Sequence, residues 1–170
     1  MIEILKIILP AILVLITAYF MIDKLLKNAE KQRSFELRRS NLSTVTPIRL
    51  RAYERLTLVL ERTRPNQLLL NNMQAGMSVL DLQTTLLSAI RHEFNHNASQ
   101  QIYVSNEVWQ ALKTTRESLV QLVNVCATKL NPENEAAALA ELLIQVFDST
   151  ESSPSDYALE ILKKEVQTLM

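Results

Sequence analysis

An uncharged apolar stretch opens the sequence, and it constrains the fold more than any other feature. No residue from Ile7 to Ile22 carries a charge, and most of residues 1–6 are apolar as well. A helix of about 20 mostly apolar residues spans the roughly 30 Å hydrocarbon core of a bilayer. The sequence therefore predicts a transmembrane anchor at residues 1–22, with the lipid bilayer as its first partner.

A cleaved signal peptide and an ordinary buried helix are the alternatives for this stretch. A signal peptide has a positively charged start and a small-x-small cleavage site. Here Glu3 and Lys6 cancel, and residues 17–23 offer no such site. The stretch also continues into a charged segment without an intervening Gly or Pro. These features favour a retained anchor.

A basic collar follows the apolar stretch. Residues 23–39 contain three acidic residues and six basic ones, namely Lys24, Lys27, Lys31, Arg33, Arg38 and Arg39. Lys and Arg close to a membrane span favour the cytoplasmic side. We therefore expect a single-pass protein of a bacterial inner membrane, with the N-terminus outside and residues 23–170 in the cytoplasm. The collar is also a candidate for contact with anionic lipid headgroups.

The composition of the chain predicts an all-α fold. It contains a single Gly and 48% hydrophobic residues, and no pair of segments alternates as strands do. We expect the anchor to continue as a helix through 23–39, followed by a Ser/Thr-rich linker at 40–46. Residues 47–170 are long enough for one helical domain with its own core. The lone Cys126 lies in an apolar helical stripe, which indicates a core residue.

Capping residues divide residues 47–170 into about five helices. We expect them at 47–64, 78–97, 106–130, 132–147 and 154–169, joined by a partly buried connection at 66–77 and a short extended segment at 101–104. Ser78 with Asp81 resembles a capping box, and Ser105 can cap the next helix. Asn131-Pro132 and Ser153-Pro154 have the pattern of a cap followed by Pro at the first helical position. Leu82, Leu86, Ile90 and Phe94, spaced by four, form the expected core stripe of the second helix.

One motif resembles an enzyme site. The segment from His92 to His96 reads H-E-x-x-H, in which two histidines four apart on a helix bind Zn²⁺ and the Glu, here Glu93, activates water. A membrane-tethered zinc hydrolase is therefore one hypothesis. Both histidines point away from the core stripe of their own helix, however, and no pattern identifies the third protein ligand that a catalytic zinc needs. Two exposed histidines beside a core Phe are the simpler interpretation, with no enzyme activity, metal or cofactor.

A second candidate surface is an arginine face. Arg51, Arg55 and Arg62 lie on one side of the helix expected at 47–64, and Arg49 and Arg64 add to its charge. Such a face can bind anionic lipid, nucleic acid or an acidic partner. Acidic residues are interleaved with the arginines, and no aromatic side chains accompany them for base stacking, so no nucleic-acid partner is expected.

Two segments of the sequence carry a resemblance. They are residues 47–62, which begin Pro-Ile-Arg-Leu-Arg-Ala-Tyr-Glu-Arg-Leu, and residues 91–105, which contain Glu93, His96 and Asn97. Together with the apolar start, they resemble a family of small uncharacterised membrane-anchored proteins of Bacteroidota-type bacteria. The resemblance covers nearly the whole chain and implies location and architecture without an activity. In that family the position of His92 is not reserved for histidine, which makes the H-E-x-x-H match incidental.

These observations favour a non-enzymatic protein that acts by binding. We expect an accessory subunit or scaffold of an inner-membrane complex, or a homo-oligomer. Lys24, Lys27, Lys31, Arg33, Arg51, Arg55 and Arg62 are the candidate interaction residues. The alternatives are the zinc hydrolase, with Glu93, His92 and His96, and a module that binds anionic lipid or nucleic acid through residues 49–64.

Overall fold

The computed structural model describes the backbone of residues 2–149 and 153–168, and their side chains except at 2–11, 14, 38, 41 and 42. These residues form six α-helices and one 3₁₀ helix, with no strand, which confirms the all-α class. The elements are α1 (Ile2–Arg62), α2 (Pro65–Asn72), α3 (Val79–His96), η1 (Ala98–Ile102), α4 (Asn106–Ala127), α5 (Ala136–Asp148) and α6 (Pro154–Gln167). The chain divides into two compact units, Met1–Val45 and Thr46–Met170.

The first unit, Met1–Val45, is helical wherever its backbone is described. Among the residues included in the search, no helix is both long and apolar enough to cross a membrane. The first half of the predicted span, residues 1–11, has side chains outside the described set. From Tyr19 to Ile22 the described side chains are exposed.

The sequence predicts a linker at 40–46 that interrupts the helix, and the structure shows no interruption there. Helix α1 runs through these residues and through Pro47 without interruption. The hydroxyls of Ser43 and Thr44 both donate to the carbonyl oxygen of Ser40, at 2.8 and 3.2 Å. Ser and Thr commonly sit inside helices by bonding to the preceding turn in this way, so a Ser/Thr-rich segment does not by itself end a helix.

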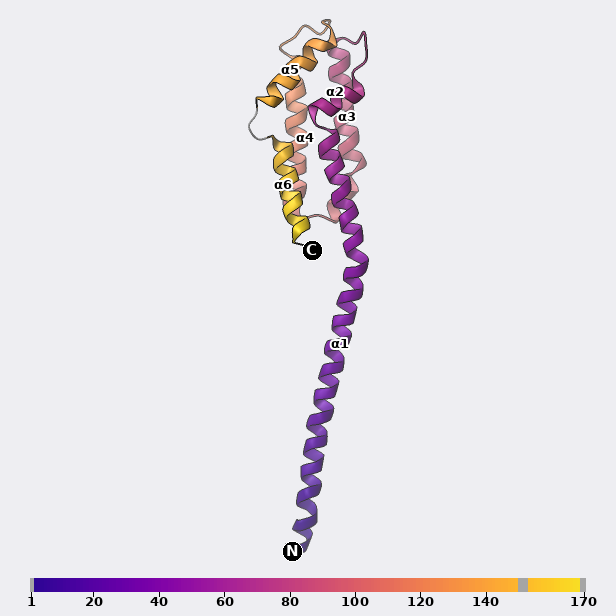
Figure 1. Ribbon diagram of the computed structural model, residues 1–170, viewed down its shortest axis with the longest axis vertical. Helices are drawn as coiled ribbons and strands as arrows, with labels where there is room; N and C mark the ends of the chain where they lie inside the picture. Colours follow the sequence, from indigo (N-terminus) through magenta and orange to yellow (C-terminus); the bar gives the residue numbers. More distant parts are fainter. Residues whose placement is uncertain (1, 150–152, 169–170) are drawn as a thin grey trace. The chain divides into compact units, whose positions relative to one another are not determined.

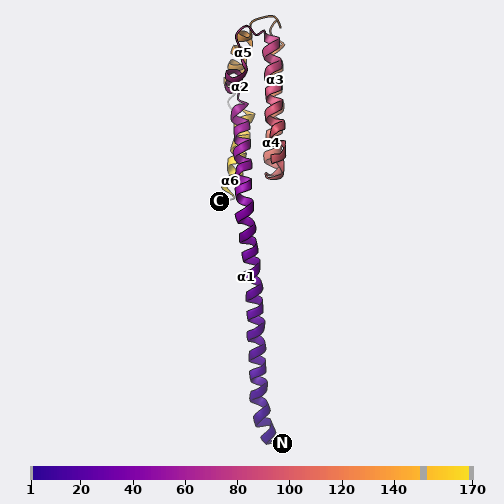
Figure 2. The same cartoon turned by 90° about the vertical axis from the view of Figure 1, so that its right-hand side faces the viewer.

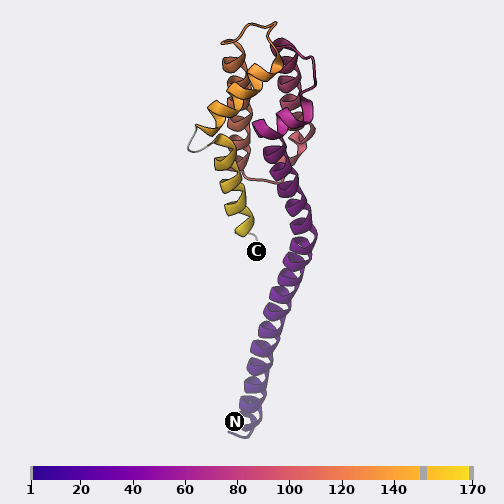
Figure 3. The ribbon, with the colours of Figure 1, turned by 45° about the horizontal axis from the view of Figure 1, so that its top comes forward.

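The second unit, Thr46–Met170, is a bundle of two layers. Viewed edge-on in Figure 2, α3 and α4 form one layer, and α2, α5, α6 and the last part of α1 form the other. Helices α4 and α6 lie side by side in Figure 1, and the short α2 and α5 run obliquely across one end of the bundle in Figure 3. The core contains the predicted stripe of Leu82, Leu86, Ile90 and Phe94, each at most 8% exposed. Cys126 is also buried, as predicted.

Three predicted helix starts are confirmed by their capping bonds. The side chain of Ser78 accepts from Asp81 N at 3.2 Å while the Asp81 carboxylate accepts from Ser78 N at 3.1 Å, completing the capping box of α3. Ser105 and Ser153 cap α4 and α6 by accepting from a backbone N–H three residues further on. Each bond satisfies one of the amide groups that a helix leaves open at its start.

Two boundary predictions in the bundle are wrong for a tertiary reason. The connection predicted at 66–77 contains helix α2, which Pro65 begins and which buries Leu68 and Leu69 in the core. The helix predicted to start at 132 starts instead at Ala136, as α5. Ala136 N donates to Met77 O at 3.0 Å, and Val79 N donates to Asn134 O at 2.8 Å. This pairing of two distant segments holds residues 132–135 out of the helix.

The segment at 101–104, predicted to be extended, is not extended in the structure. Its first two residues are the end of η1, and Tyr103 continues the turn. Gln100 N donates to Asn97 O and Tyr103 N donates to Gln100 O, both at 3.0 Å. Bonds of this i to i+3 kind make a tight helical turn between α3 and α4. The corner is therefore helical, although the sequence shows no helical periodicity there.

Candidate functional site

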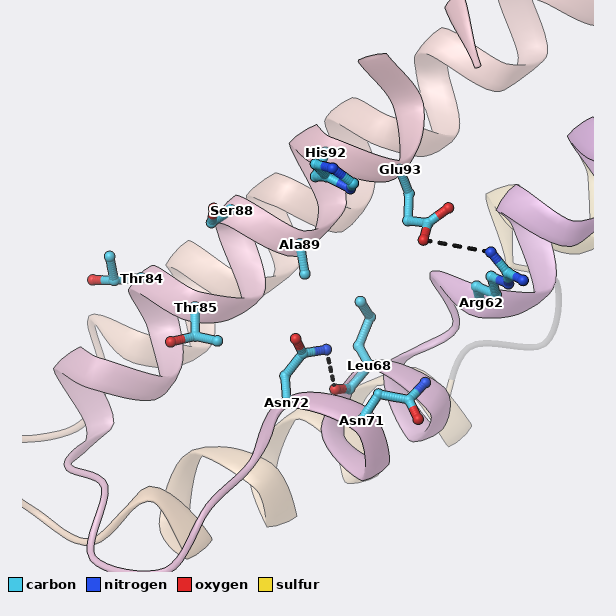
Figure 4. A pocket seen from close by; sticks show the side chains of 10 residues that line it. All are labelled: Arg62, Leu68, Asn71, Asn72, Thr84, Thr85, Ser88, Ala89, His92 and Glu93. Carbon is cyan, nitrogen blue, oxygen red and sulfur yellow. Dashed lines mark hydrogen bonds and ion pairs between the residues drawn. The ribbon is translucent and has the colours of Figure 1, made fainter. Parts of the chain in front are cut away.

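A polar groove runs along helix α3, opposite the last part of α1 at one end and opposite helix α2 at the other. It consists of two adjoining hollows of about 540 and 750 Å³ that share Arg62 and Glu93 as lining residues. The first hollow is lined by Arg51, Glu54, Arg55, Leu58, Val59, Arg62, Glu93, His96 and Asn97. The second is lined by Arg62, Leu68, Asn71, Asn72, Thr84, Thr85, Ser88, Ala89, His92 and Glu93, and Figure 4 shows these side chains. We call the two hollows together the α1–α3 groove.

One wall of the groove is a single stripe of helix α1. Residues Arg51, Arg55, Leu58 and Arg62 follow the spacing i, i+4, i+7, i+11, which places their side chains on one face of a helix. The opposite face of the same segment is buried in the core through Tyr53, Leu56 and Leu60. Because the apolar face fixes the rotation of α1, the arginines are turned toward the groove.

The other wall is the polar face of helix α3. His92 and His96 are exposed, and their rings stack with centroids 6.0 Å apart and an angle of 13° between the planes. The buried stripe of α3, from Leu82 to Phe94, holds this face outward. The prediction that the histidines point away from their own core stripe is therefore confirmed.

An ion pair crosses the groove. Arg62 Nη1 lies 3.7 Å from Glu93 Oε1, with 59% of the Arg62 side chain exposed, and the two residues face one another in Figure 4. The side chains of Arg51 and Arg55 are exposed and make no hydrogen bond or ion pair with any residue that the structure describes. The first hollow thus presents three guanidinium groups against the carboxylates of Glu54 and Glu93, so its surplus charge is positive.

The structure brings together two sets of candidates that the sequence left separate. Arg51, Arg55 and Arg62 come from α1, whereas Glu93 and His96 come from the H-E-x-x-H segment of α3, yet all five line the same hollow. No pattern in the sequence pairs these helices. Only the packing of their buried faces against a common core places the two polar faces beside one another.

Two further arginines of the predicted face serve the fold instead. The Arg64 guanidinium binds the Asp156 carboxylate of α6 at 2.7 Å. Arg49 Nε donates to Tyr103 O at 3.0 Å, and Arg49 Nη2 lies 3.2 Å from Glu165 Oε1. The candidate face on α1 is therefore narrower than the sequence suggested.

Arg49 belongs to a partly buried polar network that the sequence did not reveal. Tyr53 donates to Glu165 Oε1 at 2.6 Å, and Ser105 N donates to the same oxygen at 3.0 Å. We call Arg49, Tyr53, Ser105 and Glu165 the α1–α6 clamp, because they join α1, α6 and the start of α4. The one signal in the sequence is spacing. Arg49 and Tyr53 each lie two positions before Arg51 and Arg55, which places the two pairs on opposite sides of a helix.

The clamp shifts two pKa values in opposite directions. Burial, together with the hydrogen bond to Glu165 and its negative charge, raises the pKa of Tyr53 to about 12. For Glu165, burial alone would raise the pKa, but hydrogen bonds from Ser105 and Tyr53 and the charge of Arg49 hold it below its ordinary value. A neutral Tyr53 and an ionised Glu165 are thus the forms that the fold stabilises.

The described residues do not complete a zinc site around the H-E-x-x-H segment. Among them, no group of three or more His, Cys, Asp or Glu side chains is placed to hold a metal ion. A guanidinium group lies beside Glu93, the residue that would have to activate the zinc-bound water. The geometry therefore lends the hydrolase hypothesis no support.

The other predicted site residues lie elsewhere. Lys24, Lys27, Lys31 and Arg33 are exposed on α1 within the unit Met1–Val45, where Lys27 pairs with Asp23 at 2.7 Å. Asn97 is buried at the end of α3, where its side-chain amide donates to Glu93 O at 2.9 Å. Asn97 thus closes the last turn of α3 at the corner before η1.

Comparison with known proteins gives one family. A family model described as "Family of unknown function (DUF7935)" matches residues 1–169. No curated protein and no solved structure matches the chain.

Proposed function

The chain belongs to this family of unknown function (DUF7935), and we propose that it is a non-enzymatic, membrane-anchored interaction protein. In this proposal it is an accessory subunit or scaffold of a bacterial inner-membrane complex. Its N-terminal helix holds it in the membrane, and its second unit binds a protein partner through the α1–α3 groove in the cytoplasm.

The observation that carries the binding role is the unpaired positive charge of the groove. Arg51 and Arg55 are exposed and have no ionic partner among the described residues, whereas Arg49, two positions earlier, has several. A guanidinium group forms two parallel hydrogen bonds with a carboxylate, which makes arginine well suited to protein interfaces. The fold does not use these side chains, so they are available to a partner.

The shape of the groove favours a protein over a lipid surface or a nucleic acid. Arg51 and Arg62 are eleven residues apart, so the arginine stripe is about 16 Å long, or roughly three helical turns. Leu58, which is 43% exposed, interrupts the charges with an apolar contact. Glu54 and Glu93 would repel phosphates, whereas a helix of mixed composition can place basic or polar groups against them.

The membrane location is supported by the sequence. The mostly apolar stretch at residues 1–22 has the length of a bilayer span, and the basic collar that follows favours the cytoplasmic side. Membrane attachment predicts that alkaline carbonate washing leaves the full chain in the pellet. Recovery of the full chain in the soluble fraction would contradict this part of the proposal.

A photo-crosslinking experiment tests the groove. A photoreactive amino acid replaces Ser88, an exposed residue of the second hollow, in the full chain in native membranes. We expect a discrete adduct to a protein. The matched control places the same probe at Thr114, which is exposed on α4 and lines neither hollow. Absence of a protein adduct at Ser88, or an identical pattern at both positions, would exclude the groove as the binding site.

A further inference from the structure

Helix α5 carries an exposed acidic stripe whose spacing matches the arginine stripe of the groove. Ala137, Glu141, Ile144 and Asp148 are exposed and follow the spacing i, i+4, i+7, i+11. The other face of α5 is buried through Ala136, Leu139, Ala140 and Leu143. The buried face therefore fixes α5 so that this acidic stripe points outward.

The two stripes carry opposite charges on either side of an apolar residue. In the groove, arginines flank Leu58, which is 43% exposed; on α5, the acidic residues Glu141 and Asp148 flank Ile144, which is 37% exposed. If the helices run antiparallel with Leu58 against Ile144, Arg62 comes within about one residue of the position opposite Glu141, and Arg55 within about one residue of the position opposite Asp148. Arg51 then lies beyond the end of α5. A helix of 13 residues is about 20 Å long, which covers the part of the arginine stripe from Arg55 to Arg62.

We propose that the α1–α3 groove binds helix α5 of a second copy of this chain. The inference rests on the proposed function, since it names the partner of the same groove. An apolar contact at the centre with charge pairs around it is the usual composition of a specific protein interface. The contact buries Leu58 and Ile144, two of the exposed large apolar side chains of the second unit.

The arrangement of the two surfaces determines how copies assemble. The groove and the α5 stripe are different surfaces of one chain, so each copy offers one of each. Two copies related by a twofold axis satisfy both contacts at once, and so does a closed ring of more copies, whereas an open chain of copies leaves one groove and one stripe unoccupied at its ends. Either assembly depends on the same pairs of residues.

Charge reversal tests the pairing. Two differently tagged full-length chains are coexpressed, extracted in detergent, and the amount of one that co-purifies with the other is measured. We expect Arg62→Glu in both chains, or Glu141→Arg in both, to lower co-purification about tenfold. The double variant Arg62→Glu/Glu141→Arg should regain it, because the pair is restored with its charges exchanged. Lys129→Glu, at an exposed position outside both stripes, is the control and should have no effect.

A cysteine crosslink tests the register. One tagged chain carries Leu58→Cys and the other carries Ile144→Cys, and the membranes are mildly oxidised. We expect a disulfide-linked pair of chains only when both variants are present, because a disulfide requires Cα atoms about 4.4–6.8 Å apart. Val125→Cys, which replaces a side chain of similar exposure (45%), substitutes for Leu58→Cys in the control and should give no such product.

The outcomes separate this inference from the proposed function. Co-purification that is insensitive to both single reversals, or that the double variant does not regain, overturns the pairing of copies. If Ser88 still crosslinks to a different protein, the groove remains a binding site and only the identity of its occupant is wrong. If neither experiment detects a protein in the groove, both proposals are wrong.

Discussion

Two faces of one helical segment, the part of α1 from Thr46 to Arg62, use the same residue type in opposite ways. On one face Arg49 donates to Tyr103 O and Tyr53 and pairs with Glu165, inside the α1–α6 clamp. On the other face Arg51 and Arg55 lie exposed in the α1–α3 groove. Two residues along an α-helix correspond to a rotation of about 200°, which suffices to separate a structural arginine from an available one.

The difference between Arg49 and the groove arginines shows that the elements packed around an arginine decide whether it stabilises the fold or stays exposed. Glu165 comes from α6 and Ser105 from the start of α4, and both are more than fifty residues from Arg49 in the sequence. On the groove face, the Glu93 carboxylate of α3 pairs with Arg62, and no carboxylate from another element pairs with Arg51 or Arg55 in the described part of the chain. The predictions that follow test this contrast, beginning with the largest expected effect.

The first prediction compares two leucines on the two faces. Leu60 is 1% exposed and Leu58 is 43% exposed. Leu60→Ala should lower the free energy of unfolding by about 2–5 kcal/mol, because it leaves a cavity in the core. Leu58→Ala should change it by less than about 0.5 kcal/mol. Fluorescence of Trp109, the only Trp of the chain, during denaturant unfolding provides the measurement. Equal losses at both positions would remove the distinction between the faces.

The second prediction concerns the centre of the clamp. Glu165→Gln keeps the size of the side chain but removes the charge that Arg49, Tyr53 and Ser105 N share. We expect a loss of about 2–3 kcal/mol in the free energy of unfolding, because hydrogen bonds to a charged group are among the stronger ones. Glu160→Gln is the control: it breaks an exposed pair with Lys164 and should cost little. A similar small loss for both variants would show that the clamp does not stabilise the fold.

The third prediction is a pH dependence with two limits. The lowered pKa of Glu165 means that its contribution to stability is present above about pH 4.5 and is lost as the pH falls below that value. The raised pKa of Tyr53 means that its contribution is present below about pH 10 and is lost as the pH rises toward 12. Tyr53→Phe should cost about 1 kcal/mol at neutral pH and weaken the alkaline loss. An unchanged alkaline profile in this variant would exclude Tyr53 as the cause.

The fourth prediction concerns the groove face alone. Arg55→Glu should change the free energy of unfolding by less than about 0.5 kcal/mol, because the side chain is exposed and has no partner in the described structure. The same variant should lose the protein adduct formed at Ser88. A destabilisation comparable with that of Glu165→Gln would show that Arg55 belongs to the fold, and the contrast between the two faces would fail.

The smallest expected effect is at Glu93. Its pair with Arg62 is long, at 3.7 Å, and the Arg62 side chain is 59% exposed, so Glu93→Gln should leave stability nearly unchanged. If the chain were a zinc hydrolase, the purified protein would contain one zinc per chain, and this variant would retain the metal but lose activity. We expect elemental analysis to find no stoichiometric zinc in the natural chain. Stoichiometric zinc would instead revive the hydrolase hypothesis.

Local signals were sufficient for most of the helices and for the rotation of each one. These signals act within one or two helical turns. They are the capping box of Ser78 and Asp81, the caps at Ser105 and Ser153, and the spacing of four residues between apolar side chains from Leu82 to Phe94. Such short-range bonds and periodicities are visible in a single sequence. The same signals failed at Ala136, where pairing with Met77, far away in the sequence, delays the helix.

The sequence by itself determined the helical class and the charge-free stretch at 7–22 with its basic collar. It also determined that the arginine face of α1 and the histidine face of α3 point away from their own apolar stripes. Each of these follows from composition or from the angle between neighbouring side chains on one helix. Only the tertiary structure decided that the arginines of α1 and the histidine segment of α3 share a groove, and that Arg49 belongs to a clamp instead. The physical reason is that helix rotation is fixed locally by each apolar face, whereas the neighbours of a helix are fixed by how all the apolar faces pack together.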